Sequence, residues 1–261
     1  MEIIQEELNT VRKYILENFE EPFPENRLEK FINGKSKMVR SALTVLWIKA
    51  NGAELSENIF KVLSAGEIIH NASLLHDDVI DDAGTRRGEK TFSLEFNPKM
   101  SILAGDFLVS FAIEKLNSLN SPQIINNFKN CIKKMSQAEI KQYFLRNTKP
   151  DIDTYTEICC GKTANLFRTI MESCALIANL SEEEAKVFGE TFGILFQIRN
   201  DLNEDSAKND KVNGIMTAKD ILGIENTLIL SDNYKSKLTE MMKSFKNTKY
   251  KRALEELIQK L

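Results

Sequence analysis

Apolar residues recur every three to four positions along most of the chain, the spacing that places them on one face of an α-helix. The pattern disfavours β-strands, because no stretch alternates apolar and polar residues between hairpin turns. Residues 205–223 are polar and predict a loop with a short helix, and the chain after them is again helical. The other predicted helices cover residues 1–18, 37–50, 56–82, 99–118, 121–146, 150–179 and 181–204.

Three segments are apolar on more than one helical face, namely 99–115, 157–180 and 187–202, as in the central helices of a large bundle. No repeat, linker or compositional break divides the sequence. We therefore predict one all-α domain over residues 1–261. Glycine inside a helix costs ~1 kcal/mol relative to alanine, so close helix packing is expected where it occurs, at Gly105, Gly161, Gly189 and Gly193.

Composition narrows the function classes. Hydrophobic residues make up 42% and charged residues 28%, and the net charge is −3, so no global basic field recruits nucleic acid. The four cysteines show no CxxC spacing, which predicts reduced thiols and a cytoplasmic setting. No apolar run approaches the ~20 residues of a membrane span, so no transmembrane segment is expected.

The most distinctive stretch is Leu74–Gly88, which follows an apolar run with clustered acids and two arginines. Asp77 and Asp81 are four residues apart and share a helix face, where two carboxylates repel each other unless a cation lies between them. Hard oxygen ligands favour Mg²⁺, which often bridges to substrate phosphates. Arg86 and Arg87 suit phosphate oxygens. The stretch predicts a carboxylate–metal–phosphate site.

A second acidic cluster ends the predicted helix 181–204. Asn200 and Glu204 are four residues apart, as Asp77 and Asp81 are, and Asp201 lies beside them. Alone, a charged helix end is usually only solvated. Two such ends in one bundle could face each other across a cavity and share metal ions with a diphosphate.

Together these stretches resemble the trans-isoprenyl diphosphate synthases, the polyprenyl synthetase family, and within it the long-chain, octaprenyl-type bacterial members. The similarity spans residues 34 to about 228 and includes five motif matches in the family's order. They are Gly34-Lys35-Ser36-Lys37-Met38-Val39-Arg40, then Asp77-Asp78-Val79-Ile80-Asp81 with His70 before it and Arg86-Arg87-Gly88 after it, Leu103-Ala104-Gly105-Asp106, Gly161-Lys162-Thr163-Ala164, and Phe196-Gln197 before the second acidic cluster.

The resemblance implies a helical bundle around a central cavity and a head-to-tail condensation of isopentenyl diphosphate with an allylic diphosphate primer. It implies two to three Mg²⁺ ions, held by Asp77, Asp78, Asp81, Asn200, Asp201 and Glu204. It assigns the isopentenyl diphosphate to Lys37, Arg40, His70 and Arg87, and the allylic diphosphate to Arg86, Lys162 and, across a loosely aligned loop, Lys211. Catalysis would use Asp77, Asp81, Lys162, Thr163 and Gln197.

Product length is the finer expectation. Family members with aromatic residues four and five positions before the first aspartate block the growing chain, whereas this chain has Ser73 and Ala72 there. These lie about 6–7.5 Å deeper along the helix. The resemblance therefore implies a product longer than geranylgeranyl diphosphate, a quinone side-chain precursor handed to the membrane, with Phe128 as a candidate tunnel floor. It also suggests a homodimer.

The second motif departs from the family's pattern. Asn200 replaces its first aspartate, and the segment Gly223–Leu228 lacks a lysine that the family commonly has. Two alternatives stay open. The departure of the second motif motivates a non-catalytic subunit of a two-component prenyl synthase. A short-chain farnesyl or geranylgeranyl diphosphate synthase is the other alternative, against which Ala72 and Ser73 argue.

Overall fold

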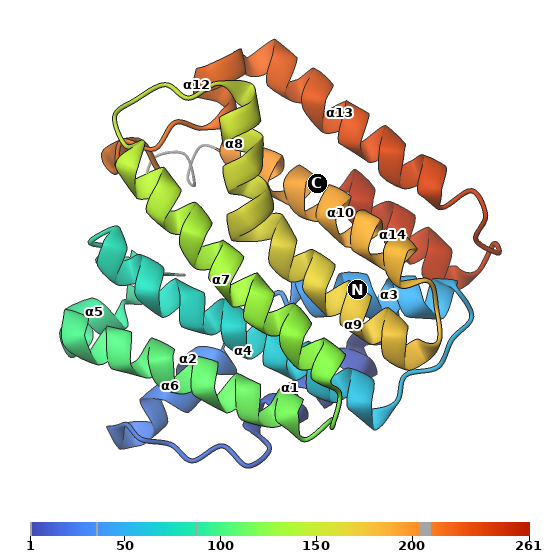
Figure 1. Ribbon diagram of the computed structural model, residues 1–261, viewed down its shortest axis with the longest axis horizontal. Helices are drawn as coiled ribbons and strands as arrows, with labels where there is room; N and C mark the ends of the chain where they lie inside the picture. Colours follow the sequence, from blue (N-terminus) through green and yellow to red (C-terminus); the bar gives the residue numbers. More distant parts are fainter. Residues whose placement is uncertain (1, 35, 87, 204–209) are drawn as a thin grey trace. The chain divides into compact units, whose positions relative to one another are not determined.

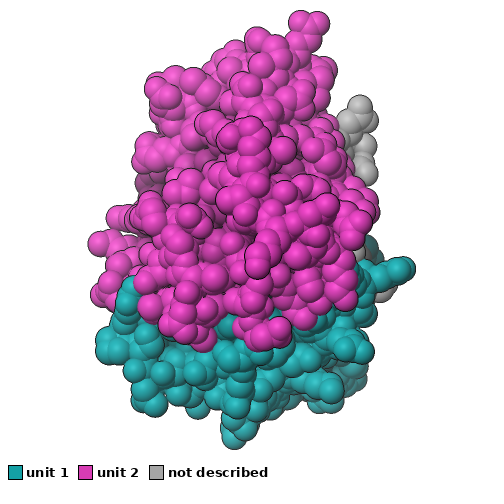
Figure 2. Space-filling model, turned by 90° about the vertical axis from the view of Figure 1, so that its right-hand side faces the viewer, with its two compact units in different colours: residues 1–45, 55–125 teal, residues 46–54, 126–261 magenta. Residues whose placement is uncertain are grey.

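The computed structural model describes residues 2–34, 36–86, 88–203 and 210–261, and helices dominate it (Figure 1). The chain divides into two compact units, coloured separately in Figure 2. The first unit contains residues 1–45 and 55–125, and the second unit contains residues 46–54 and 126–261. The boundaries fall within α3 (Val39–Ala50), between residues 54 and 55 after that helix, and near the start of α7 (Pro122–Phe144). That the whole chain forms one domain stays a prediction.

The first unit is organised around α4 (Glu57–Ile80), which packs against α1, α2, α5 and α6. Helix α4 begins where the Ser56 side chain accepts a hydrogen bond from the Ile59 N–H, a standard N-cap. Its residues are buried along most of its length, so it forms the core of this unit. The other elements are η1 (Glu2–Ile4), α1 (Gln5–Leu16), η2 (Pro24–Asn26), α2 (Arg27–Ile32), β1 (Thr85–Arg86), β2 (Glu89–Lys90), α5 (Phe92–Glu95) and α6 (Pro98–Asn117).

The second unit is organised around α10 (Glu182–Leu202), and its N-cap Ser181 is the first residue of the predicted helix 181–204. A Cβ on Gly193 would lie 2.4 Å from the Ala164 Cα, so glycine permits close backbone approach there. Helix α10 packs against α8, η3, α9, α12 and α13. The elements are α8 (Ile152–Cys159), η3 (Cys160–Ala164), α9 (Asn165–Ala178), α12 (Ala218–Leu222), α13 (Ile224–Met241) and α14 (Lys249–Gln259).

The first difference from the sequence-based expectation is a pair of short strands. The sequence pattern disfavours strands, and the structure has two, β1 and β2, which pair antiparallel with Arg86 opposite Glu89. Each strand has two residues, too few to show an alternating pattern. Gly88 has a φ of +83°, a left-handed conformation that glycine adopts without steric cost.

The second difference lies inside the predicted helix 150–179. Residues Cys160–Ala164 form a π-helix, labelled η3, which joins α8 directly to α9. Periodicity alone does not reveal one wide turn, because apolar positions continue on both sides of it. Single π turns inside α-helices occur frequently at functional sites.

Two expectations from composition agree with the structure. No helix within residues 2–34, 36–86, 88–203 and 210–261 is long and apolar enough to cross a membrane. The four cysteine thiols are free. Burial raises the pKa of Cys160 to about 11, so this thiol, located in the π-helix, is protonated at neutral pH.

Candidate active site

The first acidic motif lies at the C-terminal end of α4. Asp77 and Asp81 are both half-buried, and the Asp81 N–H donates to the Asp77 carbonyl at 2.8 Å, closing the last turn. Asp82 then adopts a left-handed φ of +47° and turns the chain away. Carboxylates at the C-terminal end of a helix lie at the negative pole of its dipole. Their repulsion therefore favours a bound cation at this helix end.

Asp78 differs from its neighbours because its side chain is completely buried. Its Oδ1 accepts a hydrogen bond from the Arg86 Nε at 2.5 Å, in an ion pair. Arg86 lies on β1, four residues after the turn at Asp82, and its side chain meets Asp78 near the end of α4. The structure therefore joins one predicted metal ligand to one predicted phosphate ligand.

The Leu103–Asp106 segment of α6 supports the same helix end. A Cβ on Gly105 would lie 2.2 Å from the His76 Nε2, so glycine makes room for that ring. The His76 Nε2 also lies 3.3 Å from the Asp106 Oδ1. Motif comparison did not single out His76, although its place directly before Asp77 is a signal that could have done so.

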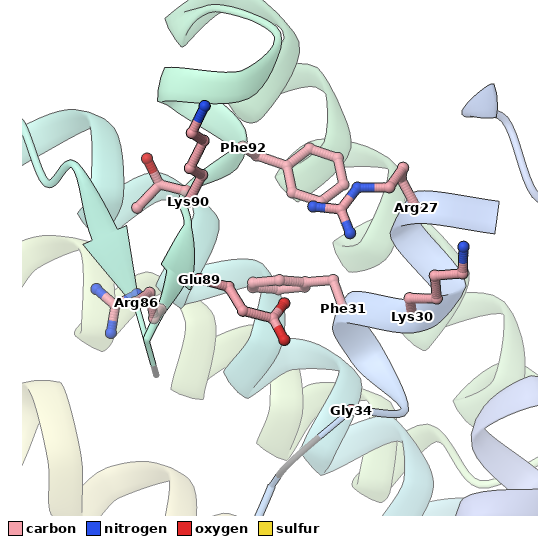
Figure 3. A pocket seen from close by; sticks show the side chains of 9 residues that line it. Arg27, Lys30, Phe31, Gly34, Arg86, Glu89, Lys90 and Phe92 are labelled. Atoms are coloured by element: carbon pink, nitrogen blue, oxygen red, sulfur yellow. The ribbon is translucent and has the colours of Figure 1, made fainter. Parts of the chain in front are cut away.

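Beside the first motif, a pocket of about 230 Å³ lies between α2 and the β1–β2 hairpin (Figure 3). The Arg27 guanidinium lies 5.9 Å from the centre of the Phe92 ring and pairs with Glu95. Sequence reasoning missed Lys30 and Lys90, whose positions around one pocket depend on the hairpin. The residues that line this pocket are Arg27, Lys30, Phe31, Gly34, Arg86, Glu89, Lys90, Thr91 and Phe92.

Two of the predicted isopentenyl diphosphate ligands lie near a buried contact. Arg40 is 9% exposed at the start of α3, and His70 is half-buried on α4. The next residue after Arg40, Ser41, donates from its N–H and its Oγ to the Glu67 Oε1, at 3.1 and 2.7 Å. Glu67 lies one turn before His70, so this contact holds the two segments together. Lys37 is exposed, and Arg87 lies outside the described residues.

The second acidic motif ends α10. Asp201 is only 2% exposed, and its carboxylate accepts three hydrogen bonds. The Tyr155 Oη and the Ala218 N–H donate to Oδ2, and the Gln197 Nε2 donates to Oδ1, each at 2.8 Å. Burial raises the pKa of Asp201, and the three hydrogen bonds oppose that rise. Asn200 is half-buried, whereas Glu204 lies outside the described residues.

The π-helix η3 carries the predicted catalytic pair Lys162 and Thr163. The Thr163 Oγ1 donates to the Gln197 Oε1 at 2.8 Å, so the structure brings these two predicted residues together. The Lys162 Nζ lies 2.5 Å from the Glu139 Oε2 on α7 and donates to the Gln142 Oε1 at 2.6 Å. The predicted phosphate ligand Lys162 is therefore held by an acid and an amide.

The remaining predicted residues are placed as follows. Ala72 is buried on α4 and Phe128 is buried on α7, while Ser73 is half-buried and donates its Oγ to the His70 carbonyl at 2.9 Å. Lys211 is exposed. Within the described part of the chain, no cluster of three or more His, Cys, Asp or Glu side chains is arranged to hold a metal ion.

Comparison with known proteins identifies the family. Octaprenyl diphosphate synthase of Escherichia coli (strain K12) is 30% identical over 186 residues, which cover 69% of this chain and 57% of that protein. The chain thus matches little more than half the length of this curated relative. The sequence model of the polyprenyl synthetase family matches residues 22–261.

Solved structures agree on the fold. Heptaprenyl diphosphate synthase from Staphylococcus aureus superimposes with a TM-score of 0.90 at 22% identity, covering 98% of this chain and 97% of that one. A geranyltransferase from Helicobacter pylori, complexed with magnesium and isoprenyl diphosphate, superimposes with a TM-score of 0.79 at 20% identity. The match covers 99% of this chain and 96% of that one. The predicted all-α, isoprenoid synthase type of fold is confirmed. With its motifs in order, its helical fold and the family match over residues 22–261, the chain belongs to the polyprenyl synthetase family.

Proposed function

We propose that this chain is a trans-prenyltransferase that condenses isopentenyl diphosphate head-to-tail with an allylic diphosphate. The observation that carries the proposal is the end of α4, where the half-buried Asp77 and Asp81 lie one turn apart and Arg86 returns beside them. Acids and a guanidinium at one helix end suit a metal-bound diphosphate. Membership of the polyprenyl synthetase family supports this reading.

The donor set at this helix end fits Mg²⁺. Two carboxylates at the negative pole of a helix supply hard oxygen ligands and a charge that a divalent cation offsets. We assign Asp77 and Asp81 to the metal, with Asn200 and Glu204 as further ligands from the second motif. When bound, Mg²⁺ would neutralise negative charge on the departing diphosphate. Two to three ions are expected from the family resemblance.

The cationic side chains would orient the two diphosphates. Arg86 and Lys162 would bind the allylic diphosphate, and their ion pairs with Asp78 and Glu139 fix their heads before substrate arrives. Thr163 and Gln197 would direct oxygen dipoles at the allylic cation that forms when diphosphate departs. That diphosphate would then accept the final proton. The isopentenyl diphosphate would bind to Lys37, Arg40, His70 and Arg87, and Lys211 is a further candidate for the allylic group.

The product is proposed to be a long all-trans polyprenyl diphosphate. The small side chains of Ala72 and Ser73 on α4 support this, as does similarity to an octaprenyl synthase. We extend the proposal to a homodimeric cytoplasmic enzyme whose product is a quinone side-chain precursor passed to the membrane. The short-chain alternative predicts that a purified sample stops at farnesyl or geranylgeranyl diphosphate.

Substitution of Asp77 tests the activity itself. Asp77→Asn should lower kcat about 10²–10³-fold, the scale of losing one group that stabilises charge in the transition state, and should raise the Mg²⁺ concentration needed for half-maximal rate. The matched control is Asp82→Asn, an exposed acid in the same run, which should retain activity. Near-wild-type turnover of the Asp77 variant would contradict the assignment of Asp77 as a metal ligand. If the wild-type chain is inactive with Mg²⁺ and both diphosphates, the result favours the alternative of a non-catalytic subunit of a two-component synthase. Asn200, in place of an aspartate, is the reason for considering that alternative.

Substitution of Ala72 tests product length. Ala72→Val and Ala72→Phe should shorten the product in that order, because each places more volume on the α4 face below Asp77. Chain length is measured by chromatography of the dephosphorylated products. Ala72 is buried, so circular dichroism must confirm folding, and Ser73→Phe at the half-buried neighbour gives a second reading. Unchanged products in all three variants would contradict the role of this helix face.

A further inference from the structure

The second unit contains a buried chain of hydrogen bonds that links three elements. Tyr155 on α8 donates to Asp201 on α10, which also accepts from the first N–H of α12, at Ala218. The Asp201 carboxylate then accepts from Gln197, which accepts from Thr163 on η3. Tyr155 and Asp201 are 6% and 2% exposed, so water competes little for these groups. Motif comparison gave Tyr155 no role.

The Gln197 amide has a donor, Nε2, and an acceptor, Oε1, and its contact with Asp201 determines the direction in which each points. A carboxylate accepts hydrogen bonds only, so it binds the Nε2 and not the Oε1 of the amide. The Oε1 is then turned to the Thr163 Oγ1, 2.8 Å away, which must donate its proton to it. The lone pairs of the Thr163 oxygen therefore point away from Gln197.

The first motif provides an independent parallel. Its second aspartate, Asp78, is also buried and is held by Arg86, while Asp77 and Asp81 are half-buried. In the second motif Asp201 is the buried member and Asn200 beside it is half-buried. In both motifs the second residue is the buried acid and contacts other protein groups, and the residue before it is less buried.

We propose that Tyr155 and Asp201 are positioning residues that orient Gln197 and, through it, the Thr163 hydroxyl, and that Asp201 is not a metal ligand. The two Asp201 oxygens already accept three hydrogen bonds out of about four that a carboxylate can accept, and the residue is 2% exposed, so little of it is open to a metal ion. The oriented Thr163 oxygen presents electron density to the positive charge of the reaction. This step rests on the proposed prenyl transfer.

Two substitutions test the proposal with a readout that separates positioning from metal binding. Tyr155→Phe and Asp201→Asn should each lower kcat about tenfold, the scale of one lost hydrogen bond to a charged group. The Mg²⁺ concentration for half-maximal rate should change less than about twofold, and the double variant should be no slower than the worse single one, because both act through one chain. Tyr143→Phe, at an exposed tyrosine on α7, is the matched control.

Three results would overturn the proposal. The first is a rise of tenfold or more in the Mg²⁺ requirement of Asp201→Asn without one in Tyr155→Phe, which marks a metal ligand. The second is an unchanged kcat in Tyr155→Phe. The third is unaltered hydrogen exchange at the Ala218 amide in Asp201→Asn, where faster exchange than in wild type is expected because the acceptor loses its charge. The exchange measurement needs no activity, so an inactive wild type would reject the proposed function while still deciding whether this anchor exists.

Discussion

Asp78 and Asp201 occupy the same place in two acidic motifs and are stabilised in different ways. Each follows the first residue of its motif near the end of a long helix, and each is buried. Asp78 pairs with one guanidinium, whereas Asp201 accepts from a phenol, an amide and a backbone N–H. The guanidinium cancels the charge of Asp78, while neutral donors leave the charge of Asp201 in place. A buried acid can thus be satisfied without being neutralised.

The largest effect should follow from removing the charged partner in the first motif. Asp78→Ala leaves Arg86 without its buried anion, and breaking such a pair costs about 3 kcal/mol of unfolding free energy. Urea unfolding measures the loss, and a double-mutant cycle with Arg86→Ala isolates the pair. A loss below about 1 kcal/mol would show that the pair behaves as an exposed surface contact, which would remove the contrast with Asp201.

A smaller effect should follow in the second unit. Tyr155→Phe removes one of three donors to Asp201, and a hydrogen bond to a charged group contributes about 1.5–3 kcal/mol. We expect the lower end of that range, because Gln197 and Ala218 keep their hydrogen bonds to the carboxylate. The same urea assay applies, with Tyr143→Phe as the reference for losing an exposed hydroxyl. Equal midpoints for the two variants would contradict a specific role of the buried phenol.

The smallest effect concerns salt. Raising NaCl from about 0.05 to 0.5 M shortens the screening length severalfold, and the Arg86 side chain is partly exposed. The coupling between Asp78 and Arg86 should therefore fall by a few tenths of a kcal/mol, while the coupling between Asp201 and Tyr155 should not change. Double-mutant cycles at the two salt concentrations measure both. A salt-sensitive Tyr155 coupling would mean that water reaches that chain.

Most helices could be predicted from the sequence because they depend on local periodicity and caps. Ser181 and the apolar pattern after it predict α10, and the polar stretch before Gly223 contains the short helix α12 as expected. The hairpin could not be predicted in this way, since two residues per strand show no period. Nor could η3, because one wide turn leaves the surrounding pattern intact.

The sequence predicts the candidate site only where the spacing of residues along a helix determines the face on which their side chains lie. A separation of four residues places Asp77 and Asp81 on one face, and both are half-buried at one helix end. Spacing does not reveal that Asp78 meets Arg86, which depends on the hairpin. Tyr155 reaches Asp201 from 46 residues away in the chain, and no local motif marks such a contact. Arg87 and Glu204 also have predicted roles, and both residues lie outside the described part of the chain.

The π-helix has a consequence for the phase of side chains along the helical rod from α8 to α9. Tyr155 and Thr163 are eight residues apart, so in a regular α-helix their directions would differ by roughly 80°. Their partners Asp201 and Gln197 are one turn apart and share one stripe of α10. The wide turn at Cys160–Ala164 changes the angular register between these two side chains. Deleting one residue there would keep the segment helical but would rotate every later side chain by about 100° about the helix axis, so this turn determines which side chains of α9 face α10.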